Sequence, residues 1–331
     1  MSVYRWGIIG PGNIALKFAD ALARSEQGVL AAVASRSAQR AREFAATYQV
    51  DKIYTDYAQL VNDVDIDIVY IATPHSHHYE QALLCLNAGK HVLLEKPLTI
   101  NALQTEKLCA LASQKGVLLQ EALWSRFMPC FAQVKQWLAE GEIGHLEYIQ
   151  SDIGFAFSDD PQNRINNPDL AGGALLDLGI YSISLSQFIV GQDPQHIQAV
   201  CHKTELGVDQ TTLVNLTYPN GQLSQFTCAT RAKCSNSMTL VGDRGRIFLP
   251  EYFWVGEAAQ LWRDGQLIEC LDFSHQVNGF EYQIAEAMRC VSAGEICSPL
   301  MSHADSIKVM QSMDEVRRQI GLQYSDSLEN S

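Results

Sequence analysis

The stretch VYRWGIIGPGNIA, residues 3–15, decides the fold of this chain. Residues 3–9 are rich in β-branched and aromatic side chains, which predicts a short buried strand. The strand ends at Gly10, and residues 13–24 have apolar positions at helical spacing. A second apolar strand follows at 29–34, which completes a strand–helix–strand unit with a tight glycine turn.

Gly10, Gly12 and Ala15 spell the pattern GxGxxA between this strand and this helix. Gly10 permits the tight turn, Gly12 lets backbone amides approach a pyrophosphate, and Ala15 lets the helix pack closely on the sheet. Because the pattern lies directly between a strand and a helix, it predicts a Rossmann dinucleotide-binding domain. The first helical residues, Asn13 and Ile14, are expected to face the same cofactor.

The alternation of strands and helices continues to about residue 122. Further strands are predicted around Tyr54 and at 67–72, 91–95 and 117–120, and helices at 37–48, 57–62, 78–88 and 102–114. Near-continuous apolar strands between amphipathic helices indicate a buried parallel sheet. We therefore expect residues 1–122 to form the Rossmann domain.

Beyond residue 145 the pattern changes to longer segments of alternating polarity, which predict antiparallel strands. These strands are predicted at 146–157, 196–203, 211–218, 223–229, 238–241 and 246–249, and helices at 128–140, 174–189, 280–292 and 303–320. We expect residues 123–331 to form an α+β domain around a large, open, mostly antiparallel sheet. The whole chain is then an α/β protein of two domains.

The chain has 331 residues and a formal net charge of −13 at pH 7, with a sequence pI near 5.1. Its field repels nucleic-acid backbones and anionic membrane surfaces, so we expect neither as a partner. An anionic cofactor must then be held by local donors such as backbone amides, a helix N-terminus and a few placed cations.

Nine cysteines are scattered along the chain without CxxC spacing, which predicts reduced thiols and no zinc site. The first residues do not resemble a secretion signal, and we find no stretch of about 18 apolar residues. We therefore expect a cytoplasmic protein. The tail at 325–331 is the one segment for which the sequence suggests disorder.

The end of the second strand bears on the choice of cofactor. NAD enzymes usually place an acidic residue here to bind the ribose hydroxyls. This chain has Ser35 and Arg36 instead, and a guanidinium suits a 2′-phosphate because it offers forked, charge-assisted hydrogen bonds. Arg40 is either a second phosphate contact or a solvated helix residue. The pattern favours NADP(H) over NAD(H), although an exposed arginine in an ordinary loop would look the same.

Two clusters of polar residues follow the third and fourth main strands, where ligands of open parallel sheets bind. The cofactor candidates are Thr73, Pro74, His75, His77, Glu95 and Lys96. Pro97 disfavours helix at Lys96 and holds its amine in an extended segment. The histidines lack a matching ligand set, so we expect no metal.

Asp177 and Tyr181 lie four residues apart in a predicted helix that follows the glycine pair Gly172–Gly173. This spacing puts a carboxylate and a phenol on one helix face. On an otherwise apolar helix the pair is either a hydrogen-bonded core pair or a catalytic pair, and the spacing alone leaves both open.

Four motifs together resemble one known family. They are GPGNIA after the first strand, EKP at 95–97, EALWSRF at 121–127 and GGALLDLGIY at 172–181. The combination resembles the oxidoreductase family of glucose-fructose oxidoreductase, inositol dehydrogenase and MocA (Gfo/Idh/MocA). The chain is most similar to its dimeric dihydrodiol dehydrogenase branch, whose members also oxidise D-xylose with NADP. The likeness extends through the last helix.

This resemblance implies roles for individual residues. Lys96, Asp177 and Tyr181 match the family's catalytic lysine, carboxylate and acid/base, and tyrosine at the last position departs from the histidine of the inositol dehydrogenases. Trp124 and Arg126, with the adjacent Phe127, match residues that line the cofactor and substrate site. The resemblance also implies a homodimer that buries the open sheet.

The mechanism implied is hydride transfer from a secondary alcohol to the nicotinamide, with Tyr181 taking the hydroxyl proton. A phenol titrates near pH 10, so a neighbouring cation is needed, and Lys96 can supply it. Five aromatic residues are either substrate contacts or core aromatics, namely Trp124, Phe155, Phe157, Trp254 and Phe280. Two alternatives remain, namely an NAD-linked polyol dehydrogenase and a non-catalytic dinucleotide sensor of the same fold.

Overall fold

The computed structural model describes residues 3–330 and divides into two compact units. The first unit runs to Phe127 and includes Gln276–Ile307, and the second contains Met128–His275 and Lys308–Asn330. The sequence analysis divides the chain once, at residue 122. The contacts instead group the helix α8 (Phe280–Ala293) with the Rossmann sheet, because α8 packs against the first helix.

The first unit is built on a six-stranded sheet in which every neighbouring pair is parallel. The strand order is β3-β2-β1-β4-β5-β6. The strands are β1 (Tyr4–Ile9), β2 (Gly28–Ala34), β3 (Lys52–Tyr54), β4 (Ile68–Ile71), β5 (His91–Glu95) and β6 (Leu119–Ala122). The helices between them are α1 (Asn13–Leu22), α2 (Ala38–Tyr48), α3 (Tyr57–Val61), α4 (His78–Asn87) and α5 (Ala102–Lys115). This is the predicted Rossmann arrangement.

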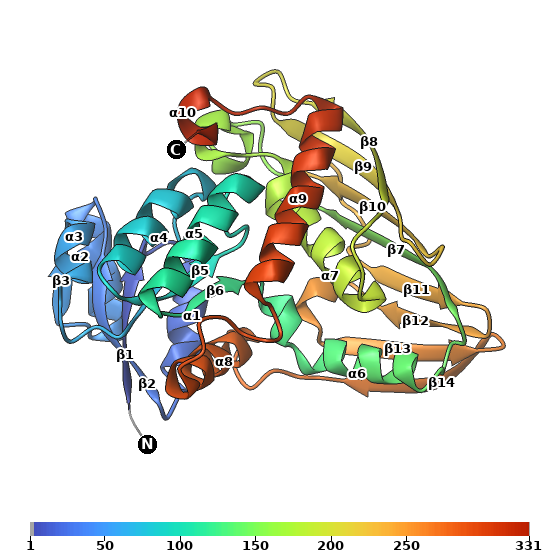
Figure 1. The fold of residues 1–331 in the computed structure, drawn as a ribbon, viewed down its shortest axis with the longest axis horizontal. Coiled ribbons are helices and arrows are strands. Elements are labelled where there is room, and N and C mark those ends of the chain that lie inside the picture. Colours follow the sequence, from blue (N-terminus) through green and yellow to red (C-terminus); the bar gives the residue numbers. More distant parts are fainter. Residues whose placement is uncertain (1–2, 331) are drawn as a thin grey trace. The chain divides into compact units, whose positions relative to one another are not determined.

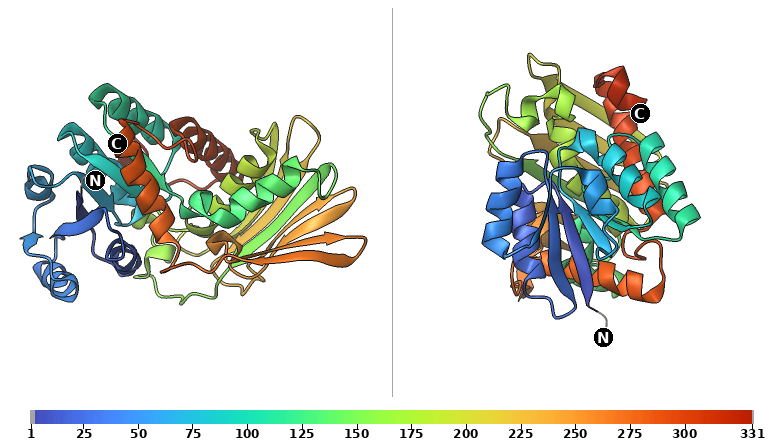
Figure 2. Two further views of the ribbon diagram at one scale, coloured as in Figure 1. Left: turned by 90° about the horizontal axis from the view of Figure 1, so that it is seen from below. Right: turned by 90° about the vertical axis from the view of Figure 1, so that its left-hand side faces the viewer.

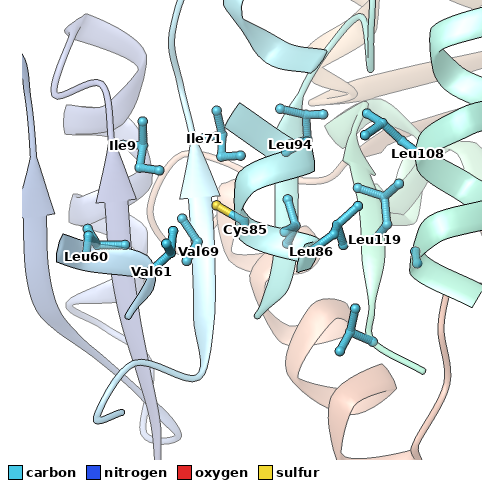
Figure 3. Close-up of a cluster of buried hydrophobic side chains, with 14 of the residues drawn as sticks. Ile9, Leu60, Val61, Val69, Ile71, Cys85, Leu86, Leu94, Leu108 and Leu119 are labelled. Carbon is cyan, nitrogen blue, oxygen red and sulfur yellow. The ribbon is translucent and has the colours of Figure 1, made fainter. Parts of the chain in front are cut away.

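Apolar side chains fill both faces of this sheet. Figure 3 shows one face, where Ile71 of β4 and Leu94 of β5 lie beside Cys85 and Leu86 of α4 in a fully buried cluster. On the other face Phe18 of α1 stacks on the ring of Tyr70, with the ring centroids 3.8 Å apart. Because both faces of the sheet are buried, a ligand can reach the sheet only at the ends of its strands. The predicted cofactor-binding residues come directly after those strand ends.

The second unit is built on an eight-stranded sheet of order β14-β13-β12-β11-β7-β10-β9-β8. Its strands are β7 (Leu146–Gly154), β8 (His196–Lys203), β9 (Asp209–Thr217), β10 (Leu223–Ala229), β11 (Met238–Gly242), β12 (Gly245–Leu249), β13 (Ala258–Arg263) and β14 (Gln266–Asp272). Only β7 and β10 pair in parallel, so the sheet is mostly antiparallel, as predicted.

Helices cover one face of this second sheet (Figures 1 and 2). They are α6 (Pro129–Ala139), α7 (Ile180–Val190) and α9 (His303–Ile320), with a π-helical turn at Leu175–Gly179 leading into α7. Six large apolar residues on strands of this sheet are exposed, including Leu267 and Ile268 of β14. The other four lie on β7 to β10. They are Tyr148, Val200, Leu213 and Leu223.

The hairpin β13–β14 is absent from the sequence predictions. Its signal was present: Asp264 and Gly265 form a two-residue turn in which both have positive φ, which is typical of a type I′ hairpin. The tail also differs from the expectation of disorder, since Asp326–Glu329 forms the short helix α10.

One helical stretch, Pro168–Val190, is apolar enough to cross a membrane, with a mean hydropathy of 1.4, so the expectation that no such stretch exists is wrong. The structure buries 89% of this window inside the protein. Such burial is typical of the core helix of a globular protein.

Candidate active site

The glycine turn after β1 combines one crowded position and one open position. Gly10 has φ +87°, and a Cβ there would lie 2.6 Å from Thr73 Cγ2. At Gly12 a Cβ would meet no atom within 4 Å. The missing side chain of Gly12 therefore leaves space in front of the N-terminus of α1. A pyrophosphate placed there would meet unpaired N–H groups of the first helical turn, which makes this end of α1 suitable for a dinucleotide.

The start of α1 has the exposure that a ligand contact needs. Gly12 is its N-cap and no side chain caps the helix. Asn13 and Ile14 are exposed, whereas Ala15 is fully buried and packs the helix onto the sheet. The two exposed residues are thus available to a cofactor.

The loop after β2 presents its cations to solvent. Ser35 is buried, and its hydroxyl accepts the N–H of Ser37, which in turn caps α2. Arg36 and Arg40 are exposed. The Arg36 guanidinium lies 3.5 Å from Nε2 of His77, and burial together with this neighbouring charge lowers the pKa of His77. Arg36 and His77 belong to different sequence motifs, and the structure brings them together.

The loop after β4 is held by hydrogen bonds. The Thr73 hydroxyl donates to Gln81, and both ring nitrogens of the buried His78 lie within 2.9 Å of the carbonyl oxygens of Thr73 and Pro97. The ring of His75 is also buried and packs edge-on to His78. The loops that follow β4 and β5, including Pro74, are therefore tied to each other.

Lys96 directly follows β5 and is half-buried. The preceding residue, Glu95, is buried, and one of its carboxylate oxygens accepts a 2.5 Å hydrogen bond from Tyr70 while the other faces the Lys96 amide. After Pro97 the Leu98 N–H donates to Glu121, a fully buried acid whose pKa is raised by burial. Buried acids thus fix the backbone on both sides of Lys96.

The segment after β6 forms a 3₁₀ turn at Trp124–Phe127, and all four of its side chains are buried. Trp124 packs against Phe280 of α8 at 4.9 Å between ring centroids. Arg126 lies 3.6 Å from Asp305, and burial lowers the pKa of its guanidinium. Phe280 accordingly contacts Trp124 in the first unit.

Asp177 lies in the π-helical turn before α7 and is buried. Both of its carboxylate oxygens accept hydrogen bonds from the Arg164 guanidinium, at 3.2 Å. Arg164 was not among the predicted site residues, because it lies in an irregular segment where the sequence gives no pairing signal. The π-helical turn is likewise not visible in the sequence.

Tyr181 lies in the first turn of α7 and is also buried. Its ring stacks on Trp254 at 5.8 Å between centroids, and Trp254 packs edge-on against Phe155. Phe155 also contacts Phe157. The predicted aromatic residue Trp254 therefore contacts the ring of Tyr181, and Phe155 extends the same aromatic cluster in the unit that also contains Asp177.

The predicted residues fall into two groups. The cofactor candidates and Lys96 belong to the first unit, and Asp177, Tyr181 and Phe155 to the second. Within residues 3–330 no group of three or more His, Cys, Asp or Glu side chains is arranged to hold a metal ion. A Rossmann sheet with an open glycine turn in one unit, and a buried acid and phenol in the other, are the features of a nicotinamide-dependent oxidoreductase.

Comparisons with known proteins agree with this class. Residues 4–123 match the family model described as an oxidoreductase family with an NAD-binding Rossmann fold, and residues 131–248 match the GFO/IDH/MocA C-terminal domain. The chain is 36% identical to trans-1,2-dihydrobenzene-1,2-diol dehydrogenase of Danio rerio, over 97% of this chain and 98% of that protein. The protein of the same name from Mus musculus is 35% identical over the same shares.

Solved structures give the same result. The 3-ketoreductase KijD10 from Actinomadura kijaniata, in complex with NADP and TDP-benzene, has a TM-score of 0.87 and 28% identity over 96% of this chain and 98% of that one. The aldose-aldose oxidoreductase from Caulobacter crescentus has a TM-score of 0.88 at 24% identity over 96% and 97%, which supports the fold. The chain belongs to the Gfo/Idh/MocA oxidoreductase family.

Proposed function

We propose that this protein oxidises a secondary alcohol of a cyclic trans-diol or a sugar, with NADP⁺ as the hydride acceptor. The observation that carries the proposal is the pair of Asp177 and Tyr181 at one end of a buried helix. The acid is held by Arg164 and the phenol packs in an aromatic cluster. A core pair would need no arginine reaching in from a half-exposed position.

The chain's residues have distinct tasks in the proposed reaction. Bound NADP⁺ supplies the hydride acceptor. Tyr181, as a phenolate, takes the proton of the substrate hydroxyl while the carbon that bears this hydroxyl gives up a hydride. The alcohol thereby becomes a carbonyl. Because a phenol has a pKa near 10, the proposal assigns to the Lys96 ammonium the charge that favours the phenolate. Asp177, fixed by Arg164, orients the substrate hydroxyl.

Three features of this chain support NADP over NAD. The second strand ends without an acid, Arg36 is exposed there, and His77 lies next to it. Two neighbouring nitrogen groups can both donate to a 2′-phosphate, and the phosphate would favour protonation of the imidazole. KijD10 was solved with NADP, which agrees with this assignment.

The aromatic surroundings of Tyr181 support a cyclic substrate. Trp254 stacks on the ring of Tyr181 and Phe155 packs edge-on against Trp254, so this cluster offers flat apolar surfaces on which a ring can pack. The relatives named as dihydrobenzenediol dehydrogenases act on such a ring, and we extend that substrate class to this chain. Trp124 of the first unit remains a further predicted substrate contact.

The test is an initial-rate screen of the purified protein. NADP⁺ and NAD⁺ are each offered with a trans-dihydrodiol, D-xylose, D-glucose and myo-inositol. We expect NADP⁺-linked turnover with the diol or D-xylose, and a fall in kcat of at least 100-fold in Tyr181→Phe, because the proton acceptor is lost. NADPH affinity should be unchanged in that variant. Tight NADPH binding without turnover on any compound would favour the sensor alternative.

The cofactor assignment is tested by Arg36→Ala. Since one charged phosphate contact is removed, we expect NADPH affinity to fall more than tenfold and NADH affinity to stay within twofold, as measured by fluorescence titration. Equal effects on both cofactors would instead favour an NAD-linked polyol dehydrogenase. Arg24→Ala, which removes an arginine from the loop after α1, is the control.

We also infer a cytoplasmic homodimer that buries the open face of the second sheet. Exposed Tyr148, Val200, Leu213 and Leu223 support this assignment, since an isologous dimer would cover the same residues on both copies. Light scattering should give twice the mass of one chain. A monomer at micromolar concentration would contradict it.

A further inference from the structure

The loop that leads into the π-helical turn contains the glycine pair Gly172–Gly173 and is packed on all sides. The Gly172 N–H donates to the carbonyl of Asn167 at 3.0 Å, and the Gly173 N–H donates to Ile165 at 2.8 Å. A Cβ on Gly172 would lie 2.6 Å from the carbonyl oxygen of Arg164. The loop therefore leaves no room for a side chain, and it also fixes the backbone of Arg164.

Asp209, the first residue of β9, holds the next part of the loop. Its side chain is fully buried, and Oδ2 accepts hydrogen bonds from the Leu175 N–H and the Thr212 hydroxyl, both at 2.8 Å. Its Oδ1 faces Gly173, where a Cβ would lie only 2.1 Å away. Within the described residues this Oδ1 has no hydrogen-bond partner. The carboxylate thus binds the first amide of the helical segment that carries Asp177.

The C-terminal segment holds the loop from the other side. The buried Tyr324 donates its hydroxyl to the carbonyl of Gly172 at 2.7 Å. The Arg317 guanidinium of α9 lies 4.8 Å from the centre of the Tyr324 ring and pairs with Glu329 of α10. The last helices therefore fix the tyrosine that fixes the loop.

We propose that Asp209 and Tyr324 are positioning residues that set the orientation of Asp177 and Tyr181 through the Gly172–Gly173 loop. The proposal rests on the catalytic roles proposed above for those two residues. Neither Asp209 nor Tyr324 needs to touch the substrate or the cofactor. Their effect passes through the Gly172 carbonyl, just before the π-helical turn, and through the Leu175 amide, the first amide of that turn.

The surroundings of Asp209 indicate a buried carboxylate that is fixed by hydrogen bonds to the protein rather than solvated by water. Asp209 interacts electrostatically with four ionisable groups, namely Arg317 of α9, Tyr324, Cys228 of β10 and Cys201 of β8. Burial raises the pKa of Asp209 to about 6. A buried acid with one oxygen unpartnered costs stability, and the two bonds that its other oxygen accepts offset part of that cost.

The experiment measures loop order and turnover in the same variants of the full chain. Asp209→Ala removes the oxygen that accepts both hydrogen bonds. We expect amide exchange at Leu175 and in residues 171–181 to be at least tenfold faster, kcat at least tenfold lower, and the Kd for NADPH within twofold of wild type. Asp209→Asn keeps one amide oxygen that can accept both bonds, so exchange and kcat should stay within about threefold. Asp193→Ala is the matched control, since it removes a carboxylate just beyond the other end of α7 and should change neither.

Tyr324→Phe covers the case in which Asp209→Ala does not fold, because it removes one hydroxyl only. It should speed exchange at 171–175 and lower kcat about threefold. Unchanged exchange in the folded variants, or faster exchange with kcat within 1.5-fold of wild type, would overturn the proposal. If the wild-type protein turns over no substrate, the proposed function has failed, and the exchange data alone decide whether Asp209 and Tyr324 order the loop.

Discussion

Two glycine-rich loops lead into helices in this molecule, and they use glycine for opposite reasons. After β1, Gly12 faces open space, so the absent side chain makes room for a ligand. Before the π-helical turn, Gly172 and Gly173 face backbone carbonyls and Asp209, so the absent side chains let the protein pack against itself. Both loops contain two glycines close together, yet the first leaves room for the proposed cofactor and the second packs the backbone before the proposed catalytic residue Asp177.

The difference indicates that mutations can change the cofactor affinity of a dehydrogenase and its turnover independently of each other. Changes at the open loop should affect cofactor affinity and leave stability alone. Changes at the packed loop should affect stability and turnover and leave cofactor affinity alone.

The largest effect is expected for Gly173→Ala. Gly173 has φ +122°, and a Cβ there would collide with Asp209, so backbone strain and steric overlap add to about 4 kcal/mol of lost unfolding free energy. Chemical denaturation measures this. The control is Gly191→Ala at the end of α7, which has φ +74° with open space around it and should cost about 1 kcal/mol. Equal costs at the two sites would show that the packing around Gly173 is not tight.

A pH effect of slightly smaller size should come from Asp209. Burial raises its pKa from the usual value near 4 to about 6, so the folded protein binds this proton more tightly than the unfolded chain. The free energy of unfolding should therefore fall as the pH rises from about 4 to about 6, by about 3 kcal/mol from this group. Asp209→Asn should lack that part of the decrease. Parallel stability curves for the two proteins between pH 4 and 7 would contradict the assignment.

The smallest effect is expected for Gly12→Ala. The added methyl group meets no protein atom within 4 Å and the backbone conformation suits any residue, so stability should change by less than about 0.5 kcal/mol. The methyl group would occupy the approach of the pyrophosphate, and we expect NADPH affinity to fall about tenfold, or about 1.4 kcal/mol. Fluorescence titration measures the affinity. An unchanged Kd would mean that the cofactor does not use this turn.

The sequence predicted most of the fold because its signals are local. Hydrophobic periodicity located the strands of the first sheet and six of the eight strands of the second. Ser37, the first residue of a predicted helix, caps α2. The hairpin at Asp264–Gly265 was missed although its turn signal is also local. Disorder at the tail was a wrong expectation, because the bonds of Glu329 to Arg317 and to the Tyr324 amide join residues that composition treats separately.

The candidate site was predictable where a motif or a strand end marks it, as at Gly10 and Lys96. Arg164 and Asp209 were not predictable, because each acts on a residue that is distant in sequence and looks like an ordinary loop or strand residue by itself. The pairing of Arg36 with His77 likewise depends on the ends of two strands, β2 and β4, that lie on either side of β1. These roles depend on contacts between residues that are far apart in the sequence. No local sequence pattern reveals such contacts.

The hydrogen bond from Tyr324 to Gly172 has a practical consequence for anyone who shortens this protein. A chain ended after Leu322 would keep every strand of both sheets and the whole glycine turn after β1. It would lose Tyr324 together with α10, so the trimmed protein should still bind dinucleotide while its second loop is released. Limited digestion from the C-terminus would thus convert a dehydrogenase into a dinucleotide carrier.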